Sequence, residues 1–206
     1  LGIFQANQLA NLIENEWHVA NWVTGITAMS LVGIIVIGGV GRIGRVARFI
    51  VPGMCALYVG GGLVVVFDHA DRVPAVLHGI VFGAFDPSAV IGGGAGLAFK
   101  EILVTGVKRA VFSNEAGVGT AALAHGAART AEPVREGLVA MLGPFIDTHL
   151  ICTLTALVIL TSGVAGHEAG VVMTAHAFEA SMPGFGAILL SVVFALFALS
   201  TMVSYA

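Results

Sequence analysis

The feature that most limits how this chain can fold is a set of apolar segments, each about 20 residues long or slightly longer. A helix of about 20 residues crosses the ~30 Å hydrocarbon core of a bilayer, and helices satisfy their own backbone hydrogen bonds there. Only 10% of the 206 residues are charged and 57% are apolar, with a mean hydropathy of +0.97. These values lie far outside the range of soluble domains. The sequence therefore predicts an all-α polytopic membrane protein.

Five segments have the length and composition of complete crossing helices, and residues 1–16 have the pattern of the end of another one. The less regular stretch 73–102 contains Pro74 and Pro87, and we expect an outer amphipathic segment there, such as a short helix on the membrane face, that leads into the segment 106–128. We expect the stretch 163–183 to form an outer loop. The expected spans are residues 19–40, 49–67, 106–128, 137–162 and 185–206.

Arginine residues distinguish the two sides of the membrane. Three follow the first complete span and two follow the segment 106–128, so the positive-inside rule places these ends in the cytoplasm. The chain begins at Leu1 and stops at Ala206 inside an apolar run. We therefore expect residues 1–206 to be an internal fragment of a single transmembrane transporter domain whose N- and C-terminal helices are missing. The arginines are Arg42, Arg45, Arg48, Arg129 and Arg135.

The segment 106–128 carries polar residues inside an otherwise apolar stretch. Its Ser-Asn-Glu sequence at 113–115 is followed by Gly117 and Gly119. Two glycines this close make a helix easier to unwind, which frees backbone carbonyls and amides to act as ligands. Polar groups at membrane depth must face protein or an aqueous cavity, so this segment is a candidate binding site. The alternative is that its glycines and alanines only allow helices to pack closely.

Several motifs along the chain resemble those of the alanine or glycine:cation symporters, also called the sodium:alanine symporter family. The longest of these motifs lie within 106–128, and further pieces extend from the first residues to the last expected span. One of them is a predicted turn, GRIG, at residues 41–44. The other matching pieces are QAN at 5–7, GVKR at 106–109, FSNEAG at 112–117, AHGAA at 124–128, GLVAML at 137–142, FIDT at 145–148 and FALST at 197–201.

This resemblance implies part of a LeuT-type fold, with two inverted repeats of five helices and a site near the membrane midplane. It implies sodium-coupled symport of a small neutral amino acid, alanine or glycine, by alternating access in the cell membrane, most simply the inner membrane of a bacterium. Sodium would be the coupling ion, with no further cofactor and no nucleic-acid partner. Proton coupling is the alternative. A passive channel and an intramembrane enzyme are rivals from other classes, but the sequence shows neither a ring-forming filter nor a nucleophile or metal signature.

The expected binding residues lie on three segments of the chain. The polar residues and glycines of 106–128 would line the cavity, and the resemblance adds a glutamine near the start and a threonine near the end. The family usually has tryptophan where Tyr205 stands, so the size of the pocket is left open. The expected substrate-binding residues are Gln5, Ser113, Asn114, Gly117, Gly119, Thr201 and Tyr205, and the possible sodium ligands are Ser200 and Thr201.

Ionisable residues inside the expected spans have roles that the sequence leaves open. Asp147 is expected either to pair with a buried cation or to form part of an ion path. Glu115 is either a neutralised carboxylate or a packing anchor. We expect His125 and His149 to be hydrogen-bonded core residues rather than metal ligands, since no second histidine or carboxylate stands three or four residues away. Cys152 is expected to be a small apolar core residue.

Overall fold

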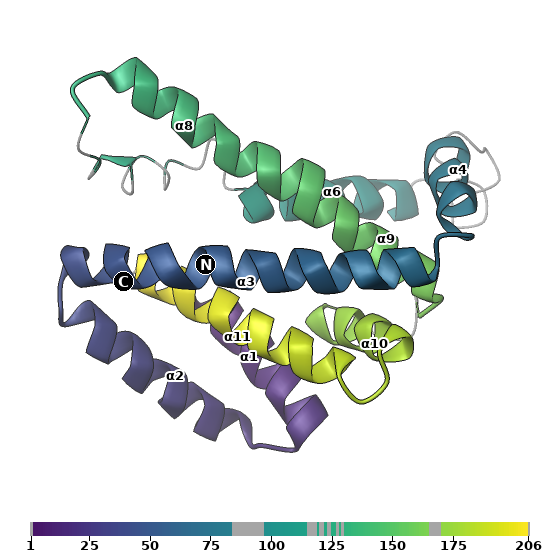
Figure 1. Cartoon of the computed structure of the whole chain (residues 1–206), viewed down its shortest axis with the longest axis horizontal. Helices are drawn as coiled ribbons and strands as arrows, with labels where there is room; N and C mark the ends of the chain where they lie inside the picture. The colour runs from purple at the N-terminus through teal and green to yellow at the C-terminus, as the bar shows by residue number, and fades with distance from the viewer. Residues whose placement is uncertain are drawn as a thin grey trace. The chain divides into compact units, whose positions relative to one another are not determined.

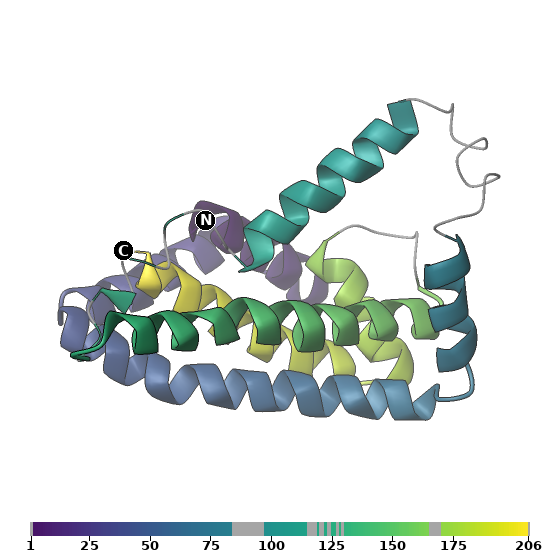
Figure 2. The ribbon, with the colours of Figure 1, turned by 90° about the horizontal axis from the view of Figure 1, so that it is seen from above.

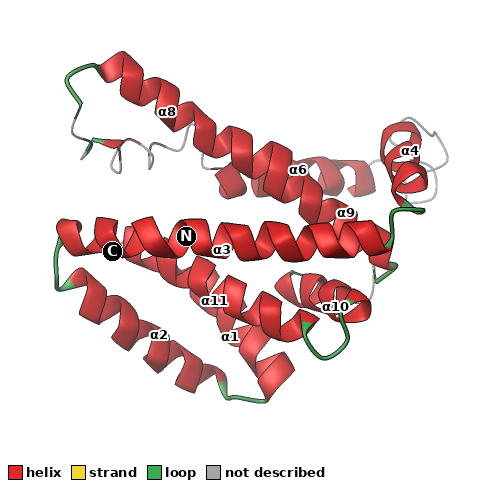
Figure 3. Cartoon of the chain, in the orientation of Figure 1, coloured by secondary structure: helices red, strands yellow, loops and turns green. Residues whose placement is uncertain are grey.

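The computed structural model describes residues 2–83, 97–114, 119, 122, 125–126, 128, 130–164 and 170–205. Every regular element in these ranges is helical (Figure 3), which confirms the all-α prediction for the described part of the chain. The helices divide into two compact units, which are described separately here. The first unit comprises Leu1–Ala70 and Leu157–Ala206, and the second comprises Asp71–Ala156.

The first unit is organised around its last helix, α11 (Gly186–Ser204), drawn in yellow in Figure 1. This helix has no charged residue, so every face of it can be buried in protein or lipid. It packs against four helices of the unit. These are α1 (Gly2–Trp17), α2 (Asn21–Val36), α3 (Val40–Asp68) and α10 (Val171–Ser181).

The core of this unit lies around Phe178 of α10, which has no exposed surface. Its ring centroid is 5.8 Å from that of Tyr58 on α3. Small residues permit the close approach of the helices: a Cβ atom at Gly61 would lie 2.6 Å from Leu189 Cδ2. The buried cluster consists of Leu12, Val65, Val158, Ala175, Ala177, Phe178 and Leu190.

Helices α1 and α11 run antiparallel. At the start of α1, a Cβ atom at Gly2 would lie 3.8 Å from Met202 Cγ, near the end of α11. At the other end of α1, the indole N–H of Trp17 donates a hydrogen bond to Ser191 Oγ at 3.5 Å. The first turn of α1 therefore lies beside the last turns of α11.

The turn between α2 and α3 differs from the predicted one. Gly39 has φ +73°, a left-handed conformation that favours glycine, and α3 begins directly after it. The predicted turn at 41–44 is therefore wrong, because these residues form the first turn of α3. Helix α2 itself has 16 residues, which is shorter than the predicted span 19–40.

The second unit contains α4 (Val73–Gly83), α6 (Leu97–Asn114), α8 (Pro133–Ile146) and the π-helical turn η1 (Asp147–Cys152). The helical path continues without a break into α9 (Thr153–Ser162), and Figure 2 shows this continuous helix in green. Pro144 lies three residues before the π-helical turn and lacks the N–H that an α-helix requires at that point. The regular hydrogen-bond pattern is thus already interrupted where the turn begins.

Three helical segments of the described chain are long and apolar enough to cross a membrane: Val40–Asp68, Pro133–Ser162 and Gly186–Ser204. They correspond to the predicted spans 49–67, 137–162 and 185–206. Helix α6 has 18 residues but is not among them, and its sequence carries four charged side chains.

The two predicted connecting segments differ in outcome. The described part of the stretch 73–102 holds the short helix α4 and the start of α6 at Leu97, which agrees with a short helix leading into the central helix. The loop predicted at 163–183 is wrong in part, because helix α10 occupies half of this stretch. Its charged residues and glycines lowered the apolar signal without preventing a helix.

Candidate functional site

Helix α6 ends in two polar residues that bond to the π-helical turn. The Ser113 hydroxyl donates a hydrogen bond to Asp147 Oδ2 at 2.5 Å, and the Asn114 amide donates one to Thr148 Oγ1 at 3.2 Å. The last two described residues of α6 thus bond to the first two residues of η1, Ser113 to Asp147 and Asn114 to Thr148. All four side chains are exposed or half-buried. We call Ser113, Asn114, Asp147 and Thr148 the α6 polar cluster.

The π-helical turn also brings Cys152 to this cluster. A π-helix places residues i and i+5 on one face, which is the spacing of Asp147 and Cys152. The Cys152 thiol lies 3.5 Å from Ser113 Oγ and 3.8 Å from Asp147 Oδ2. The prediction of a core position for Cys152 is wrong, because the residue is exposed.

The end of α6 falls inside the segment where an interrupted helix is predicted. Helix α6 is described as far as Asn114, and Gly119 has φ +91°, which is incompatible with a right-handed helix. Glu115 and Gly117, for which roles were also predicted, lie outside the described residues. An interruption of the whole crossing therefore stays a prediction, which the left-handed conformation of Gly119 supports.

The predicted sodium ligands lie near the end of α11, in the first unit. The Ser200 hydroxyl donates to the Phe197 carbonyl at 2.9 Å, and the Ser204 hydroxyl donates to the Ser200 carbonyl at 2.8 Å. Such bonds to the preceding turn are common for hydroxyls in membrane helices. They use the hydroxyl hydrogen and leave oxygen lone pairs, so the role of Ser200 and Thr201 as cation ligands stays a prediction.

Three predicted substrate contacts also belong to the first unit. Gln5 of α1 and Thr201 of α11 are half-buried, and the antiparallel packing of these helices puts them at the same end of the pair. Tyr205 follows α11 and is 39% exposed. Ser113, Asn114 and Gly119 belong to the second unit. The predicted binding residues are therefore distributed over both units.

The two histidines that were considered as metal ligands are hydrogen-bonded, as predicted. His125 Nδ1 lies 2.6 Å from Glu136 Oε1, beside a cavity of about 360 Å³. His149 Nδ1 donates to the Phe145 carbonyl at 3.1 Å, and the two rings stack with centroids 4.5 Å apart. The prediction that both histidines lie in the core is wrong, since His149 is exposed and His125 is only half-buried. The described residues contain no group of three or more His, Cys, Asp or Glu side chains that could hold a metal ion.

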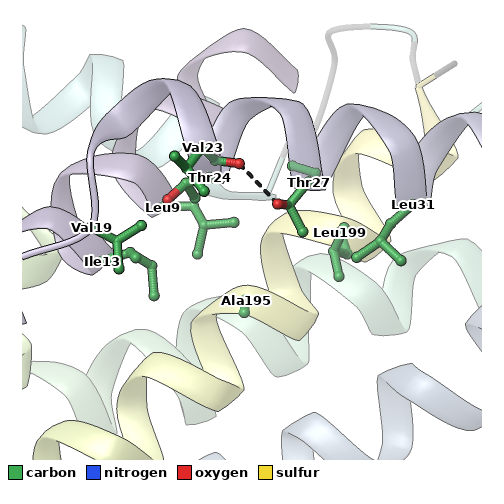
Figure 4. A pocket seen from close by; sticks show the side chains of 10 residues that line it. Leu9, Ile13, Val19, Val23, Thr24, Thr27, Leu31, Ala195 and Leu199 are labelled. Atoms are coloured by element: carbon green, nitrogen blue, oxygen red, sulfur yellow. Dashed lines mark hydrogen bonds between the residues drawn. The ribbon is translucent and has the colours of Figure 1, made fainter. Parts of the chain in front are cut away.

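The first unit has an apolar cleft of about 290 Å³ between α1, α2 and α11 (Figure 4). The threonine hydroxyl groups that line this cleft do not indicate a binding site for a polar ligand. Thr27 donates to the Val23 carbonyl at 2.8 Å, and Thr24 Oγ1 is buried without a hydrogen-bond partner among the described residues. A charged amino acid would leave its ionic groups unpaired here. The lining residues are Leu9, Ile13, Val19, Val23, Thr24, Thr27, Ala28, Leu31, Ala195 and Leu199.

The helices and the α6 polar cluster together define a polytopic membrane protein with a candidate solute or ion site beside a crossing segment. Comparison with known proteins identifies its family. The model of the Sodium:alanine symporter family matches residues 1–206, so the chain belongs to this family. The family consists of transporters, which confirms the predicted family and excludes the intramembrane enzyme.

Individual relatives agree with this assignment. The chain is 37% identical over 209 residues to a protein of Haemophilus influenzae described as an uncharacterized transporter, covering 100% of this chain and 46% of that protein. It is 35% identical over 216 residues to a putative sodium/proton-dependent alanine carrier protein of Bacillus subtilis, covering 98% and 44%. It is 34% identical over 206 residues to a sodium/alanine symporter of Methanococcus maripaludis, again covering 98% and 44%. The chain thus spans less than half the length of these relatives.

Thr148 of the cluster and Cys152 beside it were not predicted as site residues from the sequence. Thr148 lies in the FIDT motif at 145–148, directly after the carboxylate residue Asp147. Cys152 stands five residues after Asp147, a spacing that an α-helical pattern does not place on one face. The available signal was the polar pair Asp147-Thr148 within an apolar span.

Proposed function

We propose that the full-length protein is a secondary transporter that couples sodium entry to the uptake of a small neutral amino acid, alanine or glycine, by alternating access. The observation that carries this proposal is the α6 polar cluster in a chain of the sodium:alanine symporter family. The names of two relatives mention alanine together with sodium, and one of them also mentions the proton. Proton coupling is therefore the alternative that an experiment must separate.

The chemistry of the cluster fits an amino-acid zwitterion. The substrate carboxylate needs hydrogen-bond donors, and its ammonium group needs oxygen acceptors. Asn114 offers both kinds of group in one side chain, and Ser113 offers a hydroxyl oxygen. We propose that Gly117 and Gly119 add backbone groups to the same site.

In the full-length protein we assign further contacts to the first unit. We propose Gln5, Thr201 and Tyr205 as substrate contacts, with Ser200 and Thr201 as sodium ligands. We also propose a LeuT-type fold of two inverted repeats, of which the present residues are an internal part. The expected location is the cell membrane, with the arginine-rich ends in the cytoplasm.

Uptake into proteoliposomes tests this function directly. With sodium outside and potassium inside, labelled alanine is expected to accumulate above its external concentration, and replacing sodium by choline is expected to abolish accumulation. A pH gradient without sodium is expected to have no effect. Equilibration without accumulation would show a channel, and accumulation driven by the pH gradient alone would show proton coupling.

A further inference from the structure

We propose that the apolar cleft between α1, α2 and α11 holds one acyl chain of an anionic phospholipid, whose phosphate group binds Arg42 and Arg45 at the start of α3. Both parts of this site belong to the first unit. The proposal concerns a lipid of the surrounding membrane, so it is independent of the transported solute and its coupling ion.

The lining of the cleft suits a hydrocarbon chain. Apart from two threonines its lining side chains are apolar, and Thr27 already donates its hydroxyl hydrogen to the Val23 carbonyl at 2.8 Å. Val23, Thr27 and Leu31 stand four residues apart, so they form a row along one face of α2 (Figure 4). The volume of about 290 Å³ admits a single flexible chain but not a helix, which is about 10 Å wide with its side chains. The lining therefore favours a linear apolar occupant.

A positive group lies at one end of this row. Arg42 folds back from α3 to α2, where its Nη1 donates a hydrogen bond to the Ile34 carbonyl at 2.8 Å. Ile34 stands three residues after Leu31, so the guanidinium lies about one helical turn beyond the cleft. Gly38 permits this position, because a Cβ atom there would overlap the Arg42 side chain. Arg45 stands three residues after Arg42 on the same face of α3.

The charges of these two arginines suit a lipid phosphate. Both side chains are exposed, and among the described residues neither Arg42 nor Arg45 forms an ion pair. The bond to the Ile34 carbonyl uses one of the five N–H donors of the Arg42 guanidinium. Arginine binds phosphate through paired hydrogen bonds. The positive-inside rule places this end of α2 at the cytoplasmic leaflet, which carries anionic lipids.

The distances agree with the size of a phospholipid. From Ile34 back to Val23, α2 rises about 17 Å at ~1.5 Å per residue. Half of a ~30 Å hydrocarbon core is about 15 Å, which is the depth that the acyl chains of one leaflet fill. A lipid whose phosphate lies at Arg42 would therefore extend one chain along the row of cleft residues. A free phosphate would leave this apolar row unoccupied.

Two other occupants compete for the cleft. One is a helix from the rest of the full-length protein, since the present chain spans less than half the length of its relatives. The other is a second copy of the protein. Neither of them accounts for two arginines without ion pairs at the end of an apolar cleft, whereas an anionic phospholipid accounts for both features. The experiment must nevertheless separate the three.

Binding of ³H-labelled dioleoyl phosphatidylglycerol to the purified, delipidated full-length protein in detergent measures the site directly. Unlabelled phosphatidylglycerol is expected to displace the label at a concentration at least about tenfold lower than dioleoyl phosphatidylcholine, because only the first lipid carries a net charge. Glycerol phosphate, which has the charge without the chains, is expected not to displace it. Displacement by glycerol phosphate would show a site for free phosphate and contradict the lipid.

Two kinds of variant separate the chain from the head group. Arg42→Gln combined with Arg45→Gln is expected to weaken phosphatidylglycerol binding at least about tenfold and to abolish the preference over phosphatidylcholine. Ala195→Leu fills part of the cleft and is expected to weaken the binding of both lipids about tenfold. Arg48→Gln is the matched control and is expected to change binding less than about threefold, because the Arg48 guanidinium lies over the Phe49 ring, 5.0 Å from its centroid.

Three results would overturn the proposal. Equal affinity of the wild type for the two lipids would remove the arginine site. Unchanged phosphatidylglycerol affinity in Ala195→Leu would show that the chain does not enter the cleft; if that variant fails to fold, Thr27→Phe, at an exposed position of α2, decides in its place. A wild type that binds no lipid would refute the site, and cross-linking of Thr27→Cys would then show whether the same chain or a second copy covers the cleft. None of these results affects the proposed symport function, which uptake tests separately.

Discussion

The α10–α11 corner of the first unit and the end of α6 in the second unit use their side chains in opposite ways. At the corner, Phe178 is fully buried and the backbone of α11 approaches it without room for a Cβ atom at Gly186. At the end of α6, polar side chains that are exposed or half-buried bond to one another. The first region stabilises one arrangement, whereas the second presents groups that can exchange a neighbour for a ligand. Substitutions should therefore separate stability from transport.

The largest expected loss of stability follows from Phe178→Ala. Removing a fully buried aromatic ring leaves a cavity and is expected to lower the free energy of unfolding by about 3–5 kcal/mol. Thermal unfolding of the full-length protein in detergent measures the effect. The control is Phe49→Ala in α3, where the side chain is 68% exposed and a change below about 1 kcal/mol is expected. Equal losses in both variants would show that the corner is not a core.

Gly186→Ala tests the close approach of α11 to α10. A Cβ atom at this position would lie 2.3 Å from the Phe178 carbonyl carbon and oxygen, so the backbone would have to move. We expect a loss of about 1–3 kcal/mol, as for other overpacked sites. Gly60→Ala in α3 is the matched control, because nothing lies within 4 Å of its Cβ position and alanine favours a helix. Unchanged stability in Gly186→Ala would mean that α10 and α11 pack less closely than in this structure.

Glu179→Gln is expected to have the smallest effect, and that effect should depend on pH. The Glu179 carboxylate accepts hydrogen bonds from the backbone N–H groups of Ala187, at 2.9 Å, and Gly184, at 2.5 Å. These two bonds lower the pKa of Glu179 below its usual value, with the Ala187 bond contributing most. A carboxylate whose pKa is lower in the folded state stabilises the fold above the pKa of the unfolded chain. This stabilisation is lost as the pH falls through the lower folded value.

The wild-type protein should therefore lose more stability than Glu179→Gln when the pH falls from 7 to 3. At pH 7 the free energies of unfolding of the two proteins should differ by no more than about 1 kcal/mol, which is the contribution of an exposed helix cap. Unfolding midpoints measured across this pH range check the expectation. Parallel pH profiles for the two proteins would contradict it.

The sequence predicts some parts of this structure much better than others. The spans around α3, α8 to α9, and α11 follow from composition, since each is an apolar run longer than a soluble helix requires. Helix α10 was missed because the stretch 163–183 around it contains charged residues and glycines that are typical of loops. The approximate position of the candidate site could be read from polar residues at 113–115 in an apolar segment.

The pairing within the site could not be predicted from the sequence. Ser113 and Asp147 are separated by 34 residues, so their contact depends on how α6 and η1 pack. The π-helical turn also changes which residues share a face, and this brings Cys152 beside Asp147. The local pattern of apolar and polar residues does not predict such a π-helical turn or the shift in register that it causes.

Initial rates of sodium-driven alanine uptake in two variants test most directly whether the α6 polar cluster, rather than the apolar cleft, serves transport. Asn114→Ala is expected to lower the rate about tenfold to a hundredfold at normal levels in the membrane, because a hydrogen bond to a charged ligand contributes about 1.5–3 kcal/mol. Thr27→Ala removes only a bond to its own helix in the cleft and is expected to transport like wild type. Normal uptake by Asn114→Ala, or a greater loss in Thr27→Ala, would contradict the account.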